Sequence, residues 1–310
     1  MKLIEVGYLA LTLLGAPVFA QTNSNYTYLA LGDSIPFGMN DALVPPYSYS
    51  VPTASEFIGY PETVAATEFP FSPNNLVNAA CPGETSGSFL STSVPDNGCN
   101  SPHVVYPPAG SNLSPVVIPP AKGLLPSILH TAYTGAQMSF ATTQLQKNKN
   151  IKLVTLQIGA NDGLLLLDQC LGVLSCVENG LQTTVLPALA TNLGTILAGI
   201  RAEYQGTLVL VTYYSPESAL DSLVQALNST ITQVAAQFAQ ETHTPPILIA
   251  NGYAAFQLAS ALFNENACAA GLLIKLPASL YNTSPCDIHP SPLGRDLLAA
   301  TVELTILTRQ

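Results

Sequence analysis

Four short segments carry residue types that could together break a carboxylic ester. The segment GDS at 32–34 ends an apolar run, and the hydroxyl of Ser34 would become a nucleophile if an imidazole accepted its proton. His289, near the carboxyl end of the chain, could be that base. Gly83 and Asn161 could supply a backbone N–H and a side-chain amide, which are neutral donors for a developing oxyanion. These residue types predict acyl transfer through a serine.

Three of the segments follow apolar runs that are typical of buried strands. Continuous β-branched and apolar runs favour a sheet covered on both faces, and helical patterns between them predict parallel strands with right-handed crossovers. In such sheets, sites form at the carboxyl ends of the strands. The expected strands are 28–33, 75–80, 152–159, 207–214 and 246–251. The clearest expected helices are 183–204 and 216–241, and 134–148 and 291–308 are also helix-like.

The order of the segments resembles the SGNH hydrolase family, also called GDSL esterases and lipases. The motifs are GDS with Ser34, Gly83 after the second expected strand, GAND with Asn161, and His289 followed by proline. They extend from residue 32 to 293, over essentially the mature chain. The resemblance implies an α/β fold of three layers, α/β/α, with a central parallel, flavodoxin-like five-stranded sheet. It also implies Ser34 as nucleophile and His289 as base, and an oxyanion hole formed by the backbone N–H groups of Ser34 and Gly83 and the Asn161 amide.

The acid that would orient His289 departs from the family pattern. The family carries an aspartate three residues before the histidine, where this chain has Cys286, and Asp287 lies only two residues before it. Either Asp287 reaches the imidazole along a different loop path, or a backbone carbonyl near Cys286 orients the ring. Both arrangements would fix the tautomer through Nδ1. Asp287 is the candidate acid.

Each motif also has a purely structural explanation. Ser34 could be a turn or helix-cap residue, Gly83 a turn glycine, and Asn161 a turn residue. Asp33 and Asp162 are expected to brace their loops rather than to react. The combination of the motifs in one order favours the catalytic interpretation.

The composition is that of a globular chain with few charges. The 310 residues include a hydrophobic fraction of 48% and a charged fraction of 9%, with a net charge of −10. The chain has no basic run, so no nucleic-acid partner is expected, because phosphate binding needs clustered Lys and Arg. Residues 1–20 have a lysine, an apolar stretch and a small residue at the end, the pattern of a secretory signal peptide. Residues 21–310 are expected to form a single secreted or periplasmic domain without stable membrane insertion.

The six cysteines agree with export. Six cysteines allow about fifteen pairings, and pairing between neighbours is the simplest of them. That pairing gives the disulfides Cys81–Cys99, Cys170–Cys176 and Cys268–Cys286. Neither cysteines nor histidines have the spacing of a zinc site, so no metal is predicted, and hydrolysis by a serine needs no cofactor.

Residues 91–130 differ from the rest of the chain, because they are rich in Pro, Ser and Gly and also in Val, Ile and Leu. Long irregular loops in compact domains are usually functional or disordered, and this one is too apolar for a free linker. It is expected to be either a lid-like insertion over the sheet edge or a structural loop. Together with the run GLLLL at 163–167, it indicates an apolar acyl pocket.

Three functions fit these observations. The leading hypothesis is a secreted, monomeric serine esterase or lipase acting on acyl lipid or small acyl esters. An alternative is a carbohydrate acetyl esterase, although the chain has no tryptophan to stack on sugar rings. A third is a non-catalytic secreted binding protein on the same fold, since fold alone does not prove function.

Overall fold

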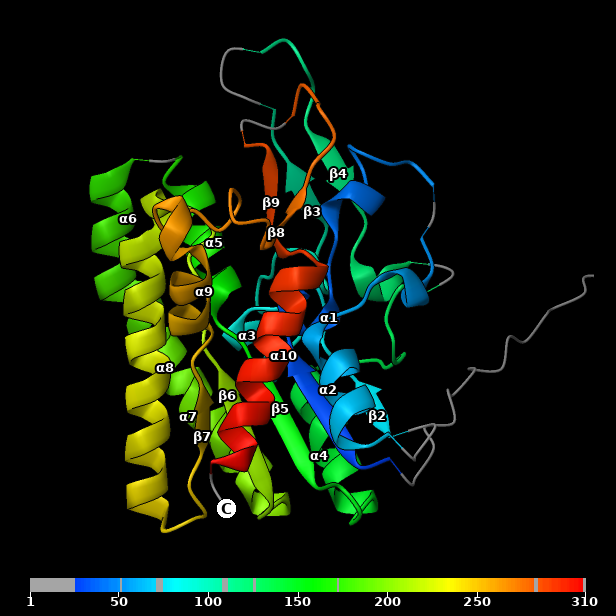
Figure 1. Cartoon of the computed structure of the whole chain (residues 1–310), viewed down its shortest axis with the longest axis vertical. Coiled ribbons are helices and arrows are strands. Elements are labelled where there is room, and N and C mark those ends of the chain that lie inside the picture. Colours follow the sequence, from blue (N-terminus) through cyan, green and yellow to red (C-terminus); the bar gives the residue numbers. More distant parts are fainter. Residues whose placement is uncertain are drawn as a thin grey trace, which may run out of the picture.

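The described part of the chain folds around one parallel sheet with helices on both sides (Figure 1). The computed structural model describes residues 26–50, 52–70, 75–107, 111–124, 127–171, 173–281 and 284–308. The signal peptide expected at 1–20 lies outside these residues.

Within the described residues, the central sheet contains five parallel strands in the order β2-β1-β5-β6-β7. They are β1 (Tyr28–Gly32), β2 (Leu76–Asn78), β5 (Leu153–Gln157), β6 (Thr207–Val211) and β7 (Leu248–Ala250). The side chains of β1 and β5 are buried along their whole length, which explains why these strands read as continuous apolar runs. Counted along the chain, the order is 2-1-3-4-5, which confirms the flavodoxin-like sheet predicted from the sequence.

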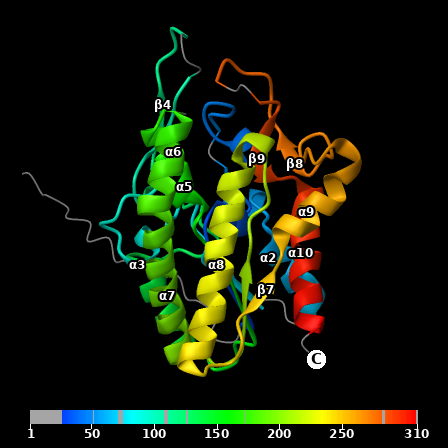
Figure 2. The same ribbon diagram turned by 90° about the vertical axis from the view of Figure 1, so that its left-hand side faces the viewer.

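Helices cover both faces of the sheet, as Figure 2 shows from the side. One layer contains α2 (Tyr60–Glu68), α9 (Gly252–Ser260) and α10 (Pro292–Leu307). The other layer contains α4 (Gln137–Lys147), α7 (Leu186–Glu203) and α8 (Asp221–Thr242). The structure therefore has the predicted three layers, and all four helices expected from the sequence form.

The helix before β6 is unusually long and apolar. It joins α6 (Leu174–Gly180), the π-helical turn η4 (Leu181–Val185) and α7 into 30 residues. A window of 18 of these residues has a mean hydropathy of 1.4, so its length and composition would suit a membrane span. In this fold its apolar stripe is buried against the sheet through Leu189, Leu193 and Ile196. A third of its most apolar window is buried, so its place in the core accounts for part of its composition.

Short elements occupy the edge of the sheet where the strands end. The helices α1 (Ser34–Phe37), α3 (Ser86–Leu90) and α5 (Ala160–Gln169) follow β1, β2 and β5. Two antiparallel hairpins stand above that edge in Figure 1, β3 (His103–Val105) with β4 (Val116–Ile118), and β8 (Leu273–Lys275) with β9 (Cys286–Pro290). Single turns complete the fold at η1 (Asp41–Leu43), η2 (Ala54–Glu56), η3 (Ala121–Gly123), η5 (Ser218–Leu220) and η6 (Ala261–Phe263). The hairpins were not expected from the sequence.

The described residues of the 91–130 segment pack against the edge of the sheet. They contribute Cys99, Ala121, Ile128 and Leu129 to a second apolar cluster, which also contains Phe37 from α1.

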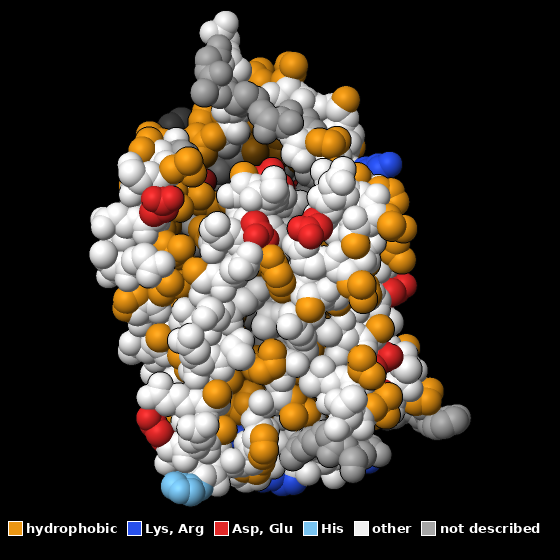
Figure 3. Space-filling model, turned by 60° about the vertical axis from the view of Figure 1, so that its left-hand side comes forward, with side chains coloured by type: hydrophobic (Ala, Val, Ile, Leu, Met, Phe, Trp, Pro, Cys, Tyr) orange, Lys and Arg blue, Asp and Glu red, His pale blue; other side chains and the backbone are white. Residues whose placement is uncertain are grey.

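The three disulfides are those expected from neighbour pairing, Cys81–Cys99, Cys170–Cys176 and Cys268–Cys286. On the face drawn in Figure 3, Lys and Arg side chains are sparse, in keeping with only nine such residues in the chain.

Candidate active site

Ser34 is the first residue of α1, directly beyond the end of β1. The Asp33 side chain caps this helix by accepting the backbone N–H of Ile35 at 3.1 Å, so the chain turns sharply at the serine. Ser34 is partly exposed and lines a pocket, while Asp33 is fully buried. The strand-to-helix turn therefore presents the serine hydroxyl at the carboxyl edge of the sheet.

Asp33 braces this turn, as the sequence indicates. Its second carboxylate oxygen accepts the hydroxyl of Tyr213, which lies just beyond β6. Burial raises the pKa of Asp33 to about 7, although the hydrogen bonds from Tyr213 and Ile35 oppose that shift. The carboxyl group thus joins the ends of β1 and β6 below the serine.

His289 connects Ser34 to Asp287. Its Nε2 lies 2.9 Å from Ser34 Oγ, and its Nδ1 lies 2.8 Å from Asp287 Oδ1. The His289 and Asp287 side chains are 8% and 1% exposed, respectively. Asp287, rather than a backbone carbonyl near Cys286, is the group that binds the imidazole.

The one-residue spacing between the two side chains follows from strand geometry. In a β-strand, side chains at i and i+2 point to the same face. Asp287 and His289 occupy such positions in β9, where both are buried, and Ile288 between them is exposed. The two side chains therefore meet on one face of β9 with a single residue between them.

The surroundings of β9 hold it in place. Cys286 at its start is bonded to Cys268, and the hydroxyl of Tyr214 donates to the carbonyl of Ile288 at 2.7 Å. Directly after the strand, Ser291 caps α10 by accepting the N–H of Gly294. The imidazole is thus fixed from both ends of its strand.

Asp41 is a site residue that sequence reasoning did not identify. Its backbone N–H donates to Asp287 Oδ2 at 3.0 Å, and its own Oδ1 lies 3.7 Å from His289 Nδ1. The side chain of Asn40 accepts the N–H of Ala42 and so shapes the turn that carries Asp41. No local pattern in the sequence marks this contact, because Asp41 and Asp287 are 246 residues apart.

The charges of these three groups shift one another's pKa values. Burial opposes ionisation of both Asp287 and His289, but their mutual attraction outweighs it. The pKa of Asp287 therefore falls below its usual range, and Asp287 and Asp41 raise the pKa of His289 to about 9. The pKa of Asp41 rises because of burial and the nearby charge of Asp287.

Gly83 occupies a position that only glycine fits. Its φ is +79°, and a Cβ there would lie 2.1 Å from the carbonyl oxygen of Asn97. The N–H of Asn97 donates to the Gly83 carbonyl at 2.8 Å, so two loops run in close contact. Among the described residues, the N–H groups of Gly83 and Ser34 have no acceptor, and both residues line the same pocket. Both donors are available for a ligand.

Asn161 is the second residue of α5, and its side-chain amide is the third candidate donor for an oxyanion. Its side-chain Nδ2 donates to the carbonyl of Glu84 at 3.1 Å, and its Oδ1 accepts Nδ2 of Asn97 at 3.3 Å. Asn97 Oδ1 in turn lies 2.7 Å from Nδ1 of His103. These bonds orient the Asn161 amide with one Nδ2 hydrogen left for a ligand, since an amide has two. Asn97 and His103 were not assigned from the sequence.

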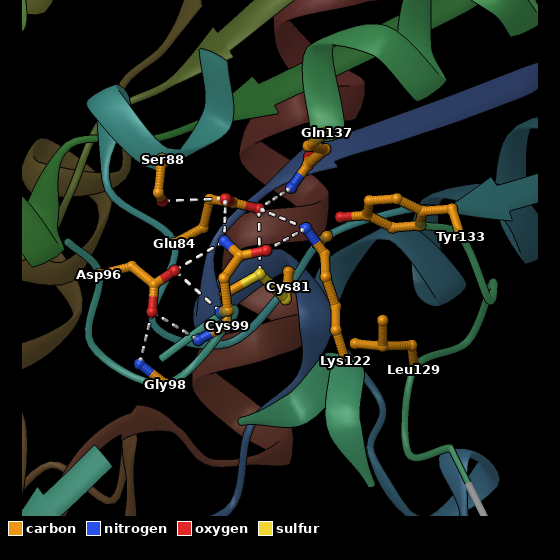
Figure 4. The surroundings of a disulfide bond; sticks show 12 residues. Cys81, Glu84, Ser88, Asp96, Gly98, Cys99, Lys122, Leu129, Tyr133 and Gln137 are labelled. Carbon is orange, nitrogen blue, oxygen red and sulfur yellow. Dashed lines mark hydrogen bonds and ion pairs between the residues drawn. A yellow bond between two sulfur atoms is a disulfide. The ribbon is translucent and has the colours of Figure 1, made fainter. Parts of the chain in front are cut away.

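Glu84 joins the loop of Gly83 to the 91–130 segment, as Figure 4 shows beside the Cys81–Cys99 disulfide. The carboxylate is fully buried and accepts Ser88 Oγ and Gln137 Nε2, each at 2.9 Å. Nζ of Lys122, from η3, lies 3.9 Å from it and also donates to Asn100. Burial raises the pKa of Glu84, and the charge of Lys122 opposes this shift. A buried ion pair thus fastens the segment to the site.

A pocket of about 260 Å³ opens beside these groups. Ser34, Gly83, Asn161 and His289 all line it, so the structure brings together the four residues singled out in the sequence. Much of its wall is apolar, and the 91–130 segment supplies a large part of that wall. The apolar lining residues include Met39, Val44, Ile118, Ala121, Leu124, Ile128, Leu164 and Ile288.

The remaining predicted roles concern bracing and metals. Asp162 braces its loop by accepting the N–H and the hydroxyl of Ser86.

In the described part of the chain, two groups of potential metal ligands have donor atoms within 4.8 Å of one another. In one, Cys81 and Cys99 are joined in a disulfide next to Glu84, and the other consists of Asp41, Asp287 and His289. In the second group the imidazole nitrogens already bind Asp287 and Ser34, so hydrogen bonds account for the cluster.

Comparison with known proteins finds similarity in solved structures alone. No family model and no curated protein matches the chain. A phospholipase A1 from Streptomyces albidoflavus has 15% identity and a TM-score of 0.49, covering 91% of this chain and 99% of that chain. A catalytic mutant of an acetylxylan esterase from Geobacillus stearothermophilus has 15% identity and a TM-score of 0.47, covering 91% and 94%. A member of the lipolytic protein G-D-S-L family from Veillonella parvula has 14% identity and a TM-score of 0.44, covering 92% and 100%.

At this degree of similarity, the chemistry of the chain has to be inferred from its own site. The site consists of a serine hydroxyl, an imidazole and a buried carboxylate in hydrogen-bonded sequence, beside two free backbone donors and an oriented amide. Ser34, His289 and Asp287 thus form the geometry of a serine-hydrolase triad at the mouth of an apolar pocket.

Proposed function

We propose that this chain is a carboxylic ester hydrolase of the SGNH type that works through an acyl-enzyme. The observation that carries the proposal is the continuous contact from Ser34 Oγ to His289 Nε2 at 2.9 Å, and from His289 Nδ1 to Asp287 at 2.8 Å. A nucleophile, a base in contact with it and a group that orients the base are what this chemistry requires.

The geometry supports a two-step reaction. Ser34 Oγ attacks the ester carbonyl carbon and gives its proton to His289 Nε2, and the carbonyl oxygen becomes an oxyanion. The N–H groups of Ser34 and Gly83 and the Asn161 amide stabilise that oxyanion. When the ester C–O bond breaks, Nε2 returns the proton to the leaving alcohol. Water then attacks the acyl-enzyme with His289 as base, which releases the acid and restores the Ser34 hydroxyl.

The pocket favours an acyl group as the part of the substrate that it binds. Its wall is mainly aliphatic, and a volume of about 260 Å³ suits a short or medium acyl chain. Sugar rings usually stack on aromatic side chains, and Tyr49 is the only Phe, Tyr or Trp side chain among its described lining residues. We therefore favour lipid or small acyl esters over acetylated carbohydrate.

The disulfides indicate an oxidising compartment. Together with the signal-like sequence at 1–20, they support a secreted or periplasmic protein whose mature part, 21–310, acts as a single domain. We further propose that it acts as a monomer on a small-molecule or lipid ester, without a cofactor, with the 91–130 segment covering the acyl pocket.

Hydrolysis of p-nitrophenyl esters from acetyl to palmitoyl tests the proposal. The mature chain should hydrolyse some of them, and Ser34→Ala should lose that activity while it keeps the thermal stability of the wild type. Ser229→Ala is the matched control, because it removes an exposed hydroxyl on α8 that bonds to Gln233, outside the pocket lining, and should leave turnover unchanged. A folded wild type without turnover on any ester would contradict the proposal and favour a binding protein. A strict preference for acetyl esters would favour the carbohydrate alternative.

A further inference from the structure

A second carboxylate stands behind the imidazole of His289. Oδ1 of Asp41 is 3.7 Å from Nδ1, whereas Oδ1 of Asp287 is 2.8 Å from the same atom. The longer distance is beyond that of a hydrogen bond, so Asp287 alone orients the ring. Asp41 touches the carboxylate of Asp287 through its backbone N–H, and its side chain remains 36% exposed toward the pocket.

Charge at this distance acts directly on the base. His289 can accept the proton of Ser34 only when its imidazole is neutral, and each nearby negative charge stabilises the protonated ring instead. One carboxylate is sufficient to hold the tautomer and to stabilise the imidazolium that forms during the reaction. A second one, without a hydrogen bond of its own to the ring, mainly keeps the resting imidazole protonated to a higher pH.

We propose that Asp41 is a positioning residue whose charge sets the pH at which His289 becomes able to activate Ser34. The proposal deepens the proposed function and rests on it. The carboxyl side chain of Asp41 acts through His289, while its backbone N–H keeps the Asp287 carboxylate in place.

The protonation state of Asp41 limits how far its charge can raise the pKa of His289. Burial and the charge of Asp287 raise the pKa of Asp41, and water in the pocket moderates this because the side chain is partly exposed. Where Asp41 is itself protonated, at lower pH, it no longer affects the imidazole. Other titratable groups interact electrostatically with this cluster, and all of them remain when Asp41 is replaced: Asp33, Tyr47, His103 and Tyr214.

The variant Asp41→Asn removes the charge and keeps the backbone N–H that binds Asp287. Its kcat/KM should reach half of its maximum at a pH lower by about 0.5 to 1 unit, the size expected for one screened charge at this distance. About 1.5 pH units below the wild-type midpoint, kcat/KM of the variant should be about three- to eightfold higher than that of the wild type. The two profiles should converge at lower pH. Asp296→Asn is the control, since it removes an exposed charge paired with Arg295 and should leave the midpoint unchanged.

Nuclear magnetic resonance titration of the His289 imidazole tests, without any turnover, whether Asp41 raises the pH at which the ring loses its proton. The imidazole signals of His289 are assigned by their loss in His289→Gln. The His289 midpoint should fall in Asp41→Asn by the same amount as the kinetic midpoint. Equal midpoints in wild type and variant would overturn the proposal, whereas a lower midpoint in a protein that hydrolyses no ester would overturn the proposed function alone. In the wild type, the Asp41 carboxyl carbon should titrate below the His289 midpoint, so that Asp41 is ionised when the imidazole loses its proton, and this tests the proposal even if the variant does not fold. A carboxyl that stays protonated through the His289 midpoint would overturn it.

Discussion

Asp287 binds the Nδ1 atom of His289 at 2.8 Å although one residue separates them in the chain. The contact is possible because both lie on the same face of β9, and Asp287 is held from its other side by the N–H of Asp41. The orientation of the base therefore depends on a strand, and on a loop that is distant in the sequence.

Replacement of Asp287 by asparagine should lower kcat strongly. An amide at this position cannot stabilise the imidazolium, and it favours the wrong tautomer of His289, which in serine proteases costs about 10⁴-fold in kcat. Steady-state kinetics on a p-nitrophenyl ester would measure this, with Asp41→Asn as the matched comparison that keeps turnover. A loss in Asp41→Asn as large as that in Asp287→Asn would mean that Asp287 is not the principal acid.

Gly83→Ala should be far more destabilising than Gly135→Ala. The two glycines have nearly the same φ, +79° and +78°, but a Cβ at Gly83 meets the Asn97 carbonyl oxygen at 2.1 Å and one at Gly135 meets nothing within 4 Å. Backbone strain alone should cost about 1 kcal/mol at Gly135, and the added clash should bring the cost at Gly83 to about 3 kcal/mol or more. Urea unfolding of the two variants measures the difference, and equal costs would show that the two loops can separate.

The effects of replacing Glu84 and Lys122 on the free energy of unfolding should be strongly coupled, because the two side chains form an ion pair. Lys122→Met leaves the Glu84 carboxylate buried without its cation and should cost about 3 kcal/mol in the free energy of unfolding. The double variant Glu84→Gln/Lys122→Met removes both charges and should be less destabilised than the sum of the two single variants. Additive losses in the unfolding experiments would show that Lys122 does not compensate the charge of Glu84.

The stability of the folded chain should fall as pH rises from about 4 to 9. The pKa of Asp33 is raised from 3.8 to about 7, so its contribution is complete below pH 3.8 and disappears as pH passes 7. The pKa of His289 is raised from 6.5 to about 9, so its contribution is complete below pH 6.5 and disappears as pH passes 9. Urea unfolding at several pH values measures this, and Asp33→Asn should flatten the dependence between pH 4 and 7. A stability that rises with pH over this range would contradict these pKa directions.

The sequence was sufficient for the parts of the fold that depend on local patterns. The five parallel strands appear as apolar runs, and Ser34, Gly83 and Asn161 follow three of them, so their meeting at one edge could be expected. The strand β9 could not be expected from its sequence, because Asp287 and His289 are buried and Ile288 is exposed, the reverse of the usual apolar-in pattern.

Other parts of the site depend on contacts between distant segments. Asp41 and Asp287 are 246 residues apart, and Asn97 and Asn161 are 64 apart, so no spacing in the sequence reveals either contact. The strands β3 and β4 have three residues each within a Pro-rich segment, which is too short for a pattern to be recognised. These features appear only when the tertiary packing is known.

Covalent labelling of Ser34 tests the central claim most directly. A fluorophosphonate probe reacts with a serine that a neighbouring base has activated, and mass spectrometry of the digested protein identifies the labelled residue. We expect one label, on the peptide that contains Ser34, and none in Ser34→Ala or His289→Ala when both are folded. A label on another residue, or no label on the folded wild type, would contradict it.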